Sequence, residues 1–254
     1  MIVYVAGYPK SGTTWITRLF GDALNCRTGG SISKEDQNEI ATEGLDRSWD
    51  LTIRKGHFIL SDETAAEPVT KAHTIKWKAL RPEDHRVVFV VRDPRDIAVS
   101  AAYHWNIPVD SSLQNMAIGT NNFRFCGSWK SYVNEWLTRL DRLPAVIVRY
   151  EDMLISPGEF LQMLSKMGFV FDQTRAVAAY RRQSFANRLV DVKKNGHEYP
   201  RGKDFNLKFM RKGIAGDWRN HFNRTMAFDA ETHFSELLQT LGYESSSTWW
   251  KEIE

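Results

Sequence analysis

Residues 5–15 read VAGYPKSGTTW, and this stretch decides the fold class of the chain. An apolar run enters a loop with two glycines, and the loop opens a helix. Such a unit aims free backbone N–H groups and the positive end of the helix dipole at one point, which suits a phosphate. Gly12 would let the backbone approach the anion closely. The stretch predicts a phosphate-binding strand–loop–helix unit; the alternative is a structural corner without a ligand.

The lysine of this loop stands in an unusual place. The spacing from Gly7 to Gly12 mimics the Walker A loop, but Thr13 and Thr14 follow where that loop has Lys-Ser/Thr. A nucleoside triphosphatase needs its lysine after the second glycine to reach the β- and γ-phosphates. Here the lysine is Lys10, inside the loop, which argues against a P-loop kinase or nucleotidase.

Length and composition indicate an ordinary globular chain. Its 254 residues are 42% hydrophobic and 26% charged, which fits one α/β domain or two small ones. The chain shows no internal repeat, low-complexity tract or linker, so we expect one domain over residues 1–254. The net charge of +3 and the pI of about 8.8 are mildly basic and decide little about partners. We expect no nucleic-acid partner.

The two cysteines, Cys26 and Cys126, have no metal or redox spacing and favour a reduced compartment. No run approaches the roughly 18–20 apolar residues that span a bilayer. The first apolar run is too short for the core of a signal peptide. We therefore expect a cytoplasmic protein without a membrane span. No acidic cluster with metal-ligand spacing lies beside the loop, so we expect no required metal.

Three β-branched apolar runs, at residues 2–6, 87–91 and 145–148, read as parallel strands buried on both faces. Each is followed by a helix signal. Strands that alternate with helices predict an α/β fold with a mostly parallel central sheet flanked by helices, similar to P-loop NTPases. An amphipathic helix is expected over residues 227–241. Loops and short helices are expected over the sheet in the remaining polar segments, at residues 25–70, 105–127 and 190–210.

Residues 8–15 resemble the 5′-phosphosulfate loop of sulfotransferases that use 3′-phosphoadenosine 5′-phosphosulfate (PAPS), in particular the cytosolic type. The resemblance implies that the loop backbone and hydroxyls hold the 5′-phosphate and that the lysine contacts the oxygen bridging to the sulfuryl group. It implies that Trp15 stacks on adenine. The phosphate roles fall on Lys10, Ser11, Gly12, Thr13 and Thr14.

A second motif, residues 88–100, reads VFVVRDPRDIAVS. Arg92 ends the strand and would face the ligand crevice of an open α/β sheet, where its planar fork suits a phosphate. The Asp-Pro pair after it predicts a capped helix, with Ser100 about two turns further on. The motif is similar to the family's 3′-phosphate motif, which implies that Arg92 and Ser100 bind that phosphate. The alternative is an arginine that pairs with Asp93 or Asp96.

A third motif, residues 211–222, reads RKGIAGDWRNHF and is close to the cytosolic family's RKGxxGDWKN segment. The resemblance implies that Arg211, Lys212 and Gly213 close over the 3′-phosphate. Without it, a basic pair would be read as solvated surface.

Two weaker matches concern the adenine. Tyr150 begins a Tyr-Glu-Asp segment after the third strand, as in the family, and is implied to contact adenine. Phe185 belongs to a Ser-Phe pair whose ring stacks on the other face of adenine in the family. Gln183 stands where the family often has a threonine, and Phe185 as a plain core residue is the alternative.

The molecule that accepts the sulfuryl group must lose a proton during transfer, and a histidine that titrates near neutral pH suits that task. Residues 69–73, VTKAH, resemble the family's Lys-Thr-His. The resemblance implies His73 as the general base, with Lys71 assisting. The alternatives are His57, His104 and Glu83.

The predicted reaction is in-line transfer of the sulfuryl group of PAPS to a hydroxyl or amine of a small molecule, with release of 3′,5′-ADP. Catalysis would come mostly from positioning and charge stabilisation, as in phosphoryl transfer, with Lys10 and Lys71 neutralising charge. The rival hypotheses are a P-loop nucleotide kinase or nucleotidase and a non-catalytic PAPS-binding protein.

No motif in the sequence identifies the acceptor molecule. We expect the loops at 25–70 and 105–127, with Tyr103, His104 and Trp105, to line its pocket. These aromatics favour an apolar or ring-bearing acceptor, with plain packing as the alternative. The cytosolic family's dimer motif, Lys-x3-Thr-Val-x3-Glu, is not matched by Arg219, Asn223-Arg224 and Phe228. We therefore expect a monomer, or a dimer formed in another way.

Overall fold

The main sheet determines where the phosphate loop lies. A computed structural model describes residues 1–24, 26–28, 39–44, 51–63, 74–195 and 211–254. Within these residues six strands form a sheet in the order β2-β3-β4-β1-β7-β8, and β5 pairs with β6 in a small second sheet. The strands are β1 (Ile2–Gly7), β2 (Cys26–Thr28), β3 (Glu39–Gly44), β4 (Leu51–Gly56), β5 (Ile59–Ser61), β6 (Thr74–Lys76), β7 (His85–Val91) and β8 (Ala145–Arg149).

The centre of the main sheet is parallel. β1 runs parallel to β4 on one side and to β7 on the other, and β8 runs parallel to β7. β3 is antiparallel to β4, and β2 is antiparallel to β3. The three predicted strands are β1, β7 and β8. The expected mostly parallel sheet is therefore confirmed.

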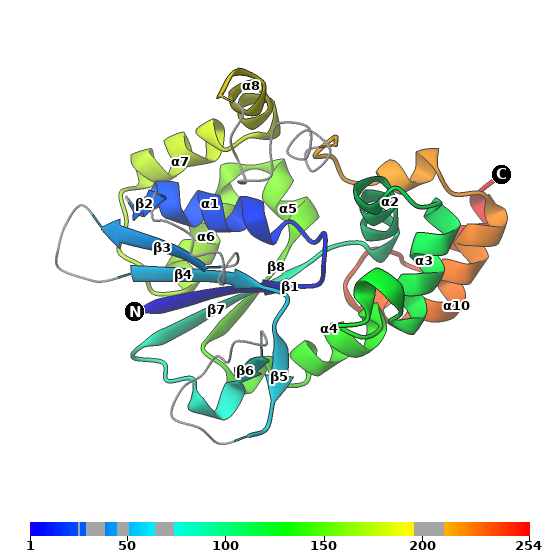
Figure 1. Ribbon diagram of the computed structural model, residues 1–254, viewed down its shortest axis with the longest axis horizontal. Helices are drawn as coiled ribbons and strands as arrows, with labels where there is room; N and C mark the ends of the chain where they lie inside the picture. The colour runs from blue at the N-terminus through cyan, green and yellow to red at the C-terminus, as the bar shows by residue number, and fades with distance from the viewer. Residues whose placement is uncertain (25, 29–38, 45–50, 64–73, 196–210) are drawn as a thin grey trace.

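Helices cover both faces of this sheet (Figure 1). Alternate residues of β1 point to opposite faces. Val3 and Val5 join a core with helices α1, α5, α6 and α7, whereas Tyr4 and Ala6 join a core with α2, α3, α4 and α10 that extends to Trp249. The helices are α1 (Thr13–Ala23), α2 (Pro94–Trp105), α3 (Val109–Ile118), α4 (Trp129–Leu137), α5 (Tyr150–Ile155), α6 (Pro157–Lys166), α7 (Gln173–Arg182), α8 (Phe185–Asn195) and α10 (Arg224–Thr240).

Short 3₁₀ helices connect the larger elements. They are η1 (Trp77–Ala79), η2 (Asn121–Phe123), η3 (Leu140–Arg142), η4 (Asp217–Asn220) and η5 (Trp249–Glu252). Within the described part of the chain, no helix is long and apolar enough to cross a membrane.

The carboxyl end of β1 is a switch point of the sheet. The chain leaves β1 through residues 8–12 into α1, and its two neighbouring strands, β4 and β7, lie on opposite sides of it. Ligands of open α/β sheets bind in the crevice outside such a point. The fold therefore places the phosphate loop in that crevice.

The prediction for residues 25–70 was wrong where the structure describes them. Instead of loops and short helices, they contain strands β2 to β5, and β4 lies between β3 and β1. Leu51 and Ile53 of β4 are buried. Residues 105–127 do contain a helix and a 3₁₀ turn, as expected. The helix predicted over 227–241 is α10, which begins three residues earlier because Asn223 caps it.

Candidate functional site

A pocket with a volume of about 250 Å³ lies at the carboxyl ends of β1, β4 and β7. It brings together residues of all three sequence motifs. The predicted nucleotide-binding residues that line it are Lys10, Gly12, Thr13, Thr14, Trp15, Arg92, Ser100, Tyr150, Phe185, Arg211, Lys212 and Gly213.

The phosphate loop has a strained and close-packed backbone. Lys10 has φ +69° and Gly12 has φ +91°, both in the left-handed region, and Gly12 precedes the first turn of α1. A Cβ on Gly12 would lie 2.4 Å from the ring of Tyr150. The glycine is thus required by its conformation and by the close approach of an aromatic ring. No described side chain caps α1, so its amino end faces the loop without a built-in acceptor.

The ammonium group of Lys10 sits among other cations. Burial, Arg92 and Lys55 together lower the pKa of Lys10 from 10.5 to about 7. Lys55 also donates a hydrogen bond from Nζ to Oγ1 of Thr14, at 3.1 Å. This crowding of positive charge favours an anionic ligand, which would restore the charged form of Lys10.

Ser11 is the exception among the loop residues. It is buried, it does not line the pocket, and its Oγ has no hydrogen-bond partner among the described residues. Its backbone N–H donates to the carbonyl of Tyr8 at 3.1 Å. The structure therefore gives no contact that would support its predicted phosphate role.

Arg92 and Ser100, the two predicted 3′-phosphate ligands of the second motif, both line the pocket. The Nη1 of Arg92 donates to the carbonyl of Lys10 at 3.0 Å, and its guanidinium lies 4.4 Å from the centre of the Tyr150 ring. The alternative pairing of Arg92 with Asp93 or Asp96 is wrong, because Asp93 instead binds Arg95 at 2.7 Å and Asp96 accepts from the backbone N–H groups of Gly216 and Trp218. Arg92 thus links the phosphate loop to the start of α2.

The third motif reaches the pocket with its cations held by a buried acid. Asp217 forms ion pairs with Arg211 and with Lys212, the latter at 2.7 Å between Oδ1 and Nζ. Gly213 has φ +65°, and a Cβ there would lie 2.3 Å from the Phe185 ring. Phe185 is partly exposed and lines the pocket, so it is not a plain core residue.

The candidate bases are unevenly described. His73 and Lys71 lie outside the described residues. His57 and His104 line the pocket. Glu83 is exposed in the turn before β7, where the neighbouring Asp84 carbonyl accepts from the N–H of Ile2, so it lies at the opposite ends of the strands. The structure therefore rules out Glu83.

His57 has a defined tautomer. Its Nδ1 lies 2.7 Å from the carbonyl oxygen of Gly7. Because a carbonyl can only accept, Nδ1 carries the proton and Nε2 of the neutral ring is an acceptor. The ring centre lies 5.9 Å from that of Phe125, which also lines the pocket.

The expected acceptor residues are partly brought together. His104 and Trp105 line the pocket, whereas Tyr103 does not. Tyr103 is half-exposed, and its ring lies 5.0 Å from the guanidinium of Arg211. Among the residues that the structure describes, no three His, Cys, Asp or Glu side chains form a cluster that could hold a metal ion.

Residues 2–242 match the family of the sulfotransferase domain. The chain belongs to the sulfotransferase family. It is 27% identical to mouse sulfotransferase 2A6 over 235 residues, covering 87% of this chain and 79% of that protein. It is 27% identical to dog sulfotransferase 1A1 over 249 residues, covering 89% of this chain and 80% of that protein.

Solved sulfotransferase structures share the fold. Mouse sulfotransferase SULT7A1, crystallised with PAP, superposes with a TM-score of 0.65 at 18% identity, covering 99% of this chain and 88% of that chain. Retinol dehydratase, in complex with androsterone and the inactive cofactor PAP, gives 0.63 at 19% identity, covering 94% and 80%. The chain is a sulfotransferase, and these comparisons give no support to the kinase, nucleotidase or non-catalytic hypotheses.

Sequence reasoning missed several residues of this sulfotransferase's pocket. Lys55 stands near the carboxyl end of β4, directly beside β1, and was missed together with that strand. The alternation of Leu51 and Ile53 with polar residues was the signal that could have found it. Other lining residues that carried no motif are Arg18, Leu154 and Arg188, whereas Phe125 lies in the 105–127 stretch that was expected to line the acceptor pocket.

Proposed function

We propose that this sulfotransferase takes the sulfuryl group from PAPS, passes it to a hydroxyl or amine of a small molecule, and releases PAP, which is 3′,5′-ADP. The observation that carries the proposal is the meeting of three distant motifs in one pocket. Lys10, Arg92 and Arg211 come from separate parts of the sequence and line the same space. PAP in the complexes of SULT7A1 and retinol dehydratase is in keeping with this donor.

The 5′-phosphate would bind at the phosphate loop. There the amino end of α1, the hydroxyls of Thr13 and Thr14, and the cations Lys10 and Lys55 face the pocket. Backbone N–H groups at a helix start and nearby ammonium groups together suit a phosphate. Ser11 keeps its proposed role from the family resemblance alone.

The 3′-phosphate would bind between two elements. Arg92 and Ser100 approach from the end of β7 and from α2, and Arg211, Lys212 and Gly213 approach from the third motif. Arginine forks and a lysine suit a dianionic phosphate. This subsite would distinguish PAPS from nucleotides without a 3′-phosphate.

The adenine would lie among three aromatic rings. Trp15 and Tyr150 pack edge to face with ring centres 5.7 Å apart, and the indole N–H of Trp15 donates to the carbonyl of Gln183 at 2.8 Å. Phe185 lines the same pocket. Fixed aromatic rings of this kind offer stacking area to a flat base.

The acceptor would enter at the end lined by His57, His104, Trp105 and Phe125. Its oxygen or nitrogen would attack sulfur while the bond between sulfur and the phosphate oxygen breaks. PAPS would supply the activated sulfuryl group, Lys10 would neutralise the departing phosphate, and a histidine would take the proton. By the family resemblance this histidine is His73, with Lys71 assisting, and His57 and His104 are the alternatives in the pocket.

The test is transfer of radiolabelled sulfate from PAPS to a panel of phenols, alcohols, amines and sugars. The proposal expects labelled product with at least one acceptor and none after heat inactivation. Tight PAP binding without transfer to any acceptor of a wide panel would instead favour a non-catalytic protein.

The base is assigned by three matched variants, His73→Ala, His57→Ala and His104→Ala, each checked for retained PAP binding. We expect His73→Ala to lose the transfer step while PAP binding persists. Full activity of His73→Ala would contradict that assignment. The base would then be His57 or His104, whichever variant loses activity.

A further inference from the structure

Asp96 lies between the two predicted 3′-phosphate ligands of the second motif. It stands four residues after Arg92 and four before Ser100, so it shares a face of α2 with Ser100. Its side chain is fully buried. Burial raises the pKa of the Asp96 carboxyl, and the charge of Arg92 acts in the opposite direction.

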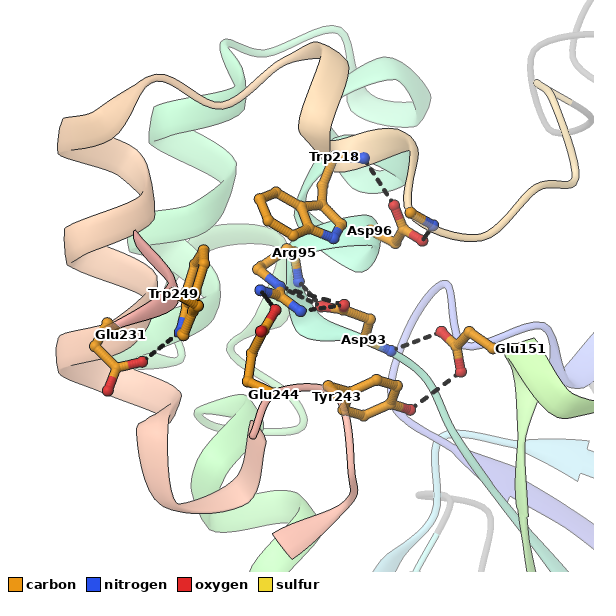
Figure 2. Close-up of polar contacts among 10 residues, drawn as sticks. Asp93, Arg95, Asp96, Glu151, Trp218, Glu231, Tyr243, Glu244 and Trp249 are labelled. Carbon is orange, nitrogen blue, oxygen red and sulfur yellow. Dashed lines mark hydrogen bonds and ion pairs between the residues drawn. The ribbon is translucent and has the colours of Figure 1, made fainter. Parts of the chain in front are cut away.

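The carboxylate of Asp96 binds the backbone of the third motif. Oδ2 accepts from the N–H of Gly216 at 2.7 Å, and Oδ1 accepts from the N–H of Trp218 at 2.9 Å (Figure 2). These two residues flank Asp217, whose own carboxylate holds Arg211 and Lys212. A continuous set of contacts therefore runs from α2 to the two cations of the third motif.

The neighbouring Arg95 fixes the same region from its other side. Its guanidinium lies 4.0 Å from the centre of the Trp218 ring and 4.4 Å from that of Trp249, against both indoles (Figure 2). It also binds Asp93 at 2.7 Å and forms an ion pair with Glu244. Trp218 is thus held by its ring as well as by its backbone N–H. The third motif has little freedom to shift along α2.

We propose that Asp96 is a positioning residue that holds the two halves of the 3′-phosphate subsite in register. One half is Arg92 and Ser100, and the other is Arg211 to Gly213. Asp96 itself does not line the pocket. The inference rests on the proposed function, because the 3′-phosphate belongs to the proposed donor.

The experiment compares calorimetric binding of PAP with that of 5′-AMP, which lacks the 3′-phosphate, in wild-type protein and in Asp96→Asn. The asparagine amide would point its N–H₂ at one of the two backbone donors, so the third motif would move. We expect PAP affinity to fall on the order of 10- to 100-fold. Affinity for 5′-AMP should fall far less, because 5′-AMP lacks the phosphate that the displaced Arg211 and Lys212 would hold.

Glu231→Gln is the matched control. Glu231 is another buried carboxylate at the edge of the same cluster, where it accepts from the indole N–H of Trp249 at 2.5 Å. Both variants should lower the melting temperature, but Glu231→Gln should keep the wild-type ratio of PAP to 5′-AMP affinity. An unchanged ratio in Asp96→Asn, with a melting temperature lowered as in Glu231→Gln, would show that Asp96 is merely structural and overturn the inference.

Two further sets of variants test whether Asp96 acts through Arg211 and Lys212. In an Arg211→Ala/Lys212→Ala background, adding Asp96→Asn should change PAP affinity less than about twofold, because the cations it positions are gone. A fully additive loss there would overturn the inference. Should Asp96→Asn fail to fold, Asp96→Glu replaces it, because this variant keeps both acceptor oxygens but displaces them. An unchanged ratio of PAP to 5′-AMP affinity in Asp96→Glu would likewise overturn the inference.

The wild-type measurement separates this inference from the proposed function. Wild-type protein that binds PAP no more tightly than 5′-AMP would overturn the proposed donor, and the inference with it. A clear wild-type preference that survives in Asp96→Asn would overturn the inference alone.

Discussion

The proposed donor end and the proposed acceptor end of the pocket are built from different parts of the fold. The donor end rests on a left-handed loop, on strand and helix termini, and on carboxylates such as Asp96 and Asp217 that are fully buried. The acceptor end is formed by side chains such as His57, Trp105 and Phe125, and Phe125 is half-exposed. In the proposed assignment, the backbone and buried ion pairs therefore fix the donor site, whereas side chains shape the acceptor site. The predictions below test this division.

Lys10→Met should have the largest effect. It removes the charge that would neutralise the departing phosphate, while leaving the aromatic and 3′-phosphate contacts intact. We expect kcat at saturating PAPS to fall by about 10²- to 10³-fold, the usual cost of a lost transition-state donor. PAP affinity should fall far less.

The measurement is initial-rate transfer of labelled sulfate alongside calorimetric PAP binding. Exposed Lys193→Met on α8 is the control and should behave as wild type. Activity of Lys10→Met within severalfold of wild type would contradict the placing of Lys10 at the reacting oxygens.

Gly213→Ala should disrupt the donor end by backbone geometry alone. The Cβ of the new alanine would lie 2.3 Å from the Phe185 ring, and its backbone would have to adopt φ +65°. Gly127→Ala is a matched control, since Gly127 has φ +72° with nothing within 4 Å of the added Cβ. Both should lose about 1 kcal/mol of unfolding free energy from the left-handed backbone.

In addition, Gly213→Ala should weaken PAP binding by roughly tenfold or more, the size expected when a core-like contact is overpacked by 1–3 kcal/mol. Equal PAP affinities of the two alanine variants would show that the Phe185–Gly213 contact plays no part in the donor site.

Affinity for PAP should depend on pH through Lys10. Its pKa is about 7 in the free protein, and a bound anion favours the charged form and raises that pKa. At pH values below the free pKa the lysine is already charged, so this group adds no pH dependence. Above it, binding must take up a proton, and affinity should fall by on the order of tenfold between pH 7 and pH 8.5.

Calorimetry at pH 8 in buffers of different ionisation enthalpy measures that proton uptake. Lys10→Met should remove it. Proton uptake that persists in Lys10→Met would assign the titration to another group.

Phe125→Ala should have the smallest effect and should be confined to the acceptor end. Removing a half-exposed ring should raise the KM for the acceptor by a few-fold, in line with about 1 kcal/mol of lost contact. PAP affinity should stay unchanged. Phe228→Ala, an equally exposed ring on α10, is the control. A loss of PAP affinity as large as the change in acceptor KM would show that the two ends are not separate.

The fold was readable where burial left a strong pattern. β7 is buried along nearly its whole length, and its residues 87–91 are an unbroken apolar run; β1 reads in the same way. β4 lies between β3 and β1 but alternates apolar and polar residues and sits in a polar stretch, so it was read as a loop. The polar composition of the surrounding segment led to a loop prediction, although the alternation of apolar and polar residues within β4 indicates a strand.

The residues of the proposed donor site could be predicted to share one pocket because they belong to contiguous motifs. The residues that hold those motifs together could not be predicted from the sequence. The contact of Asp96 with Gly216 and Trp218 joins positions about 120 residues apart through backbone N–H groups, which leave no side-chain signature. Lys55 was missed for a related reason, since its place beside Thr14 depends on β4 pairing with β1. Residues that act through tertiary pairing need the fold to be known first.

The central claim is that the pocket is built for the donor of sulfuryl transfer. Calorimetric titration of the wild-type protein with PAP and, separately, with ATP–Mg²⁺ tests it most directly. The cations of three motifs and the absence of a lysine after Gly12 predict that PAP binds at least about 100-fold more tightly, a difference of roughly 2.7 kcal/mol. Binding of ATP–Mg²⁺ as tight as that of PAP would contradict the account.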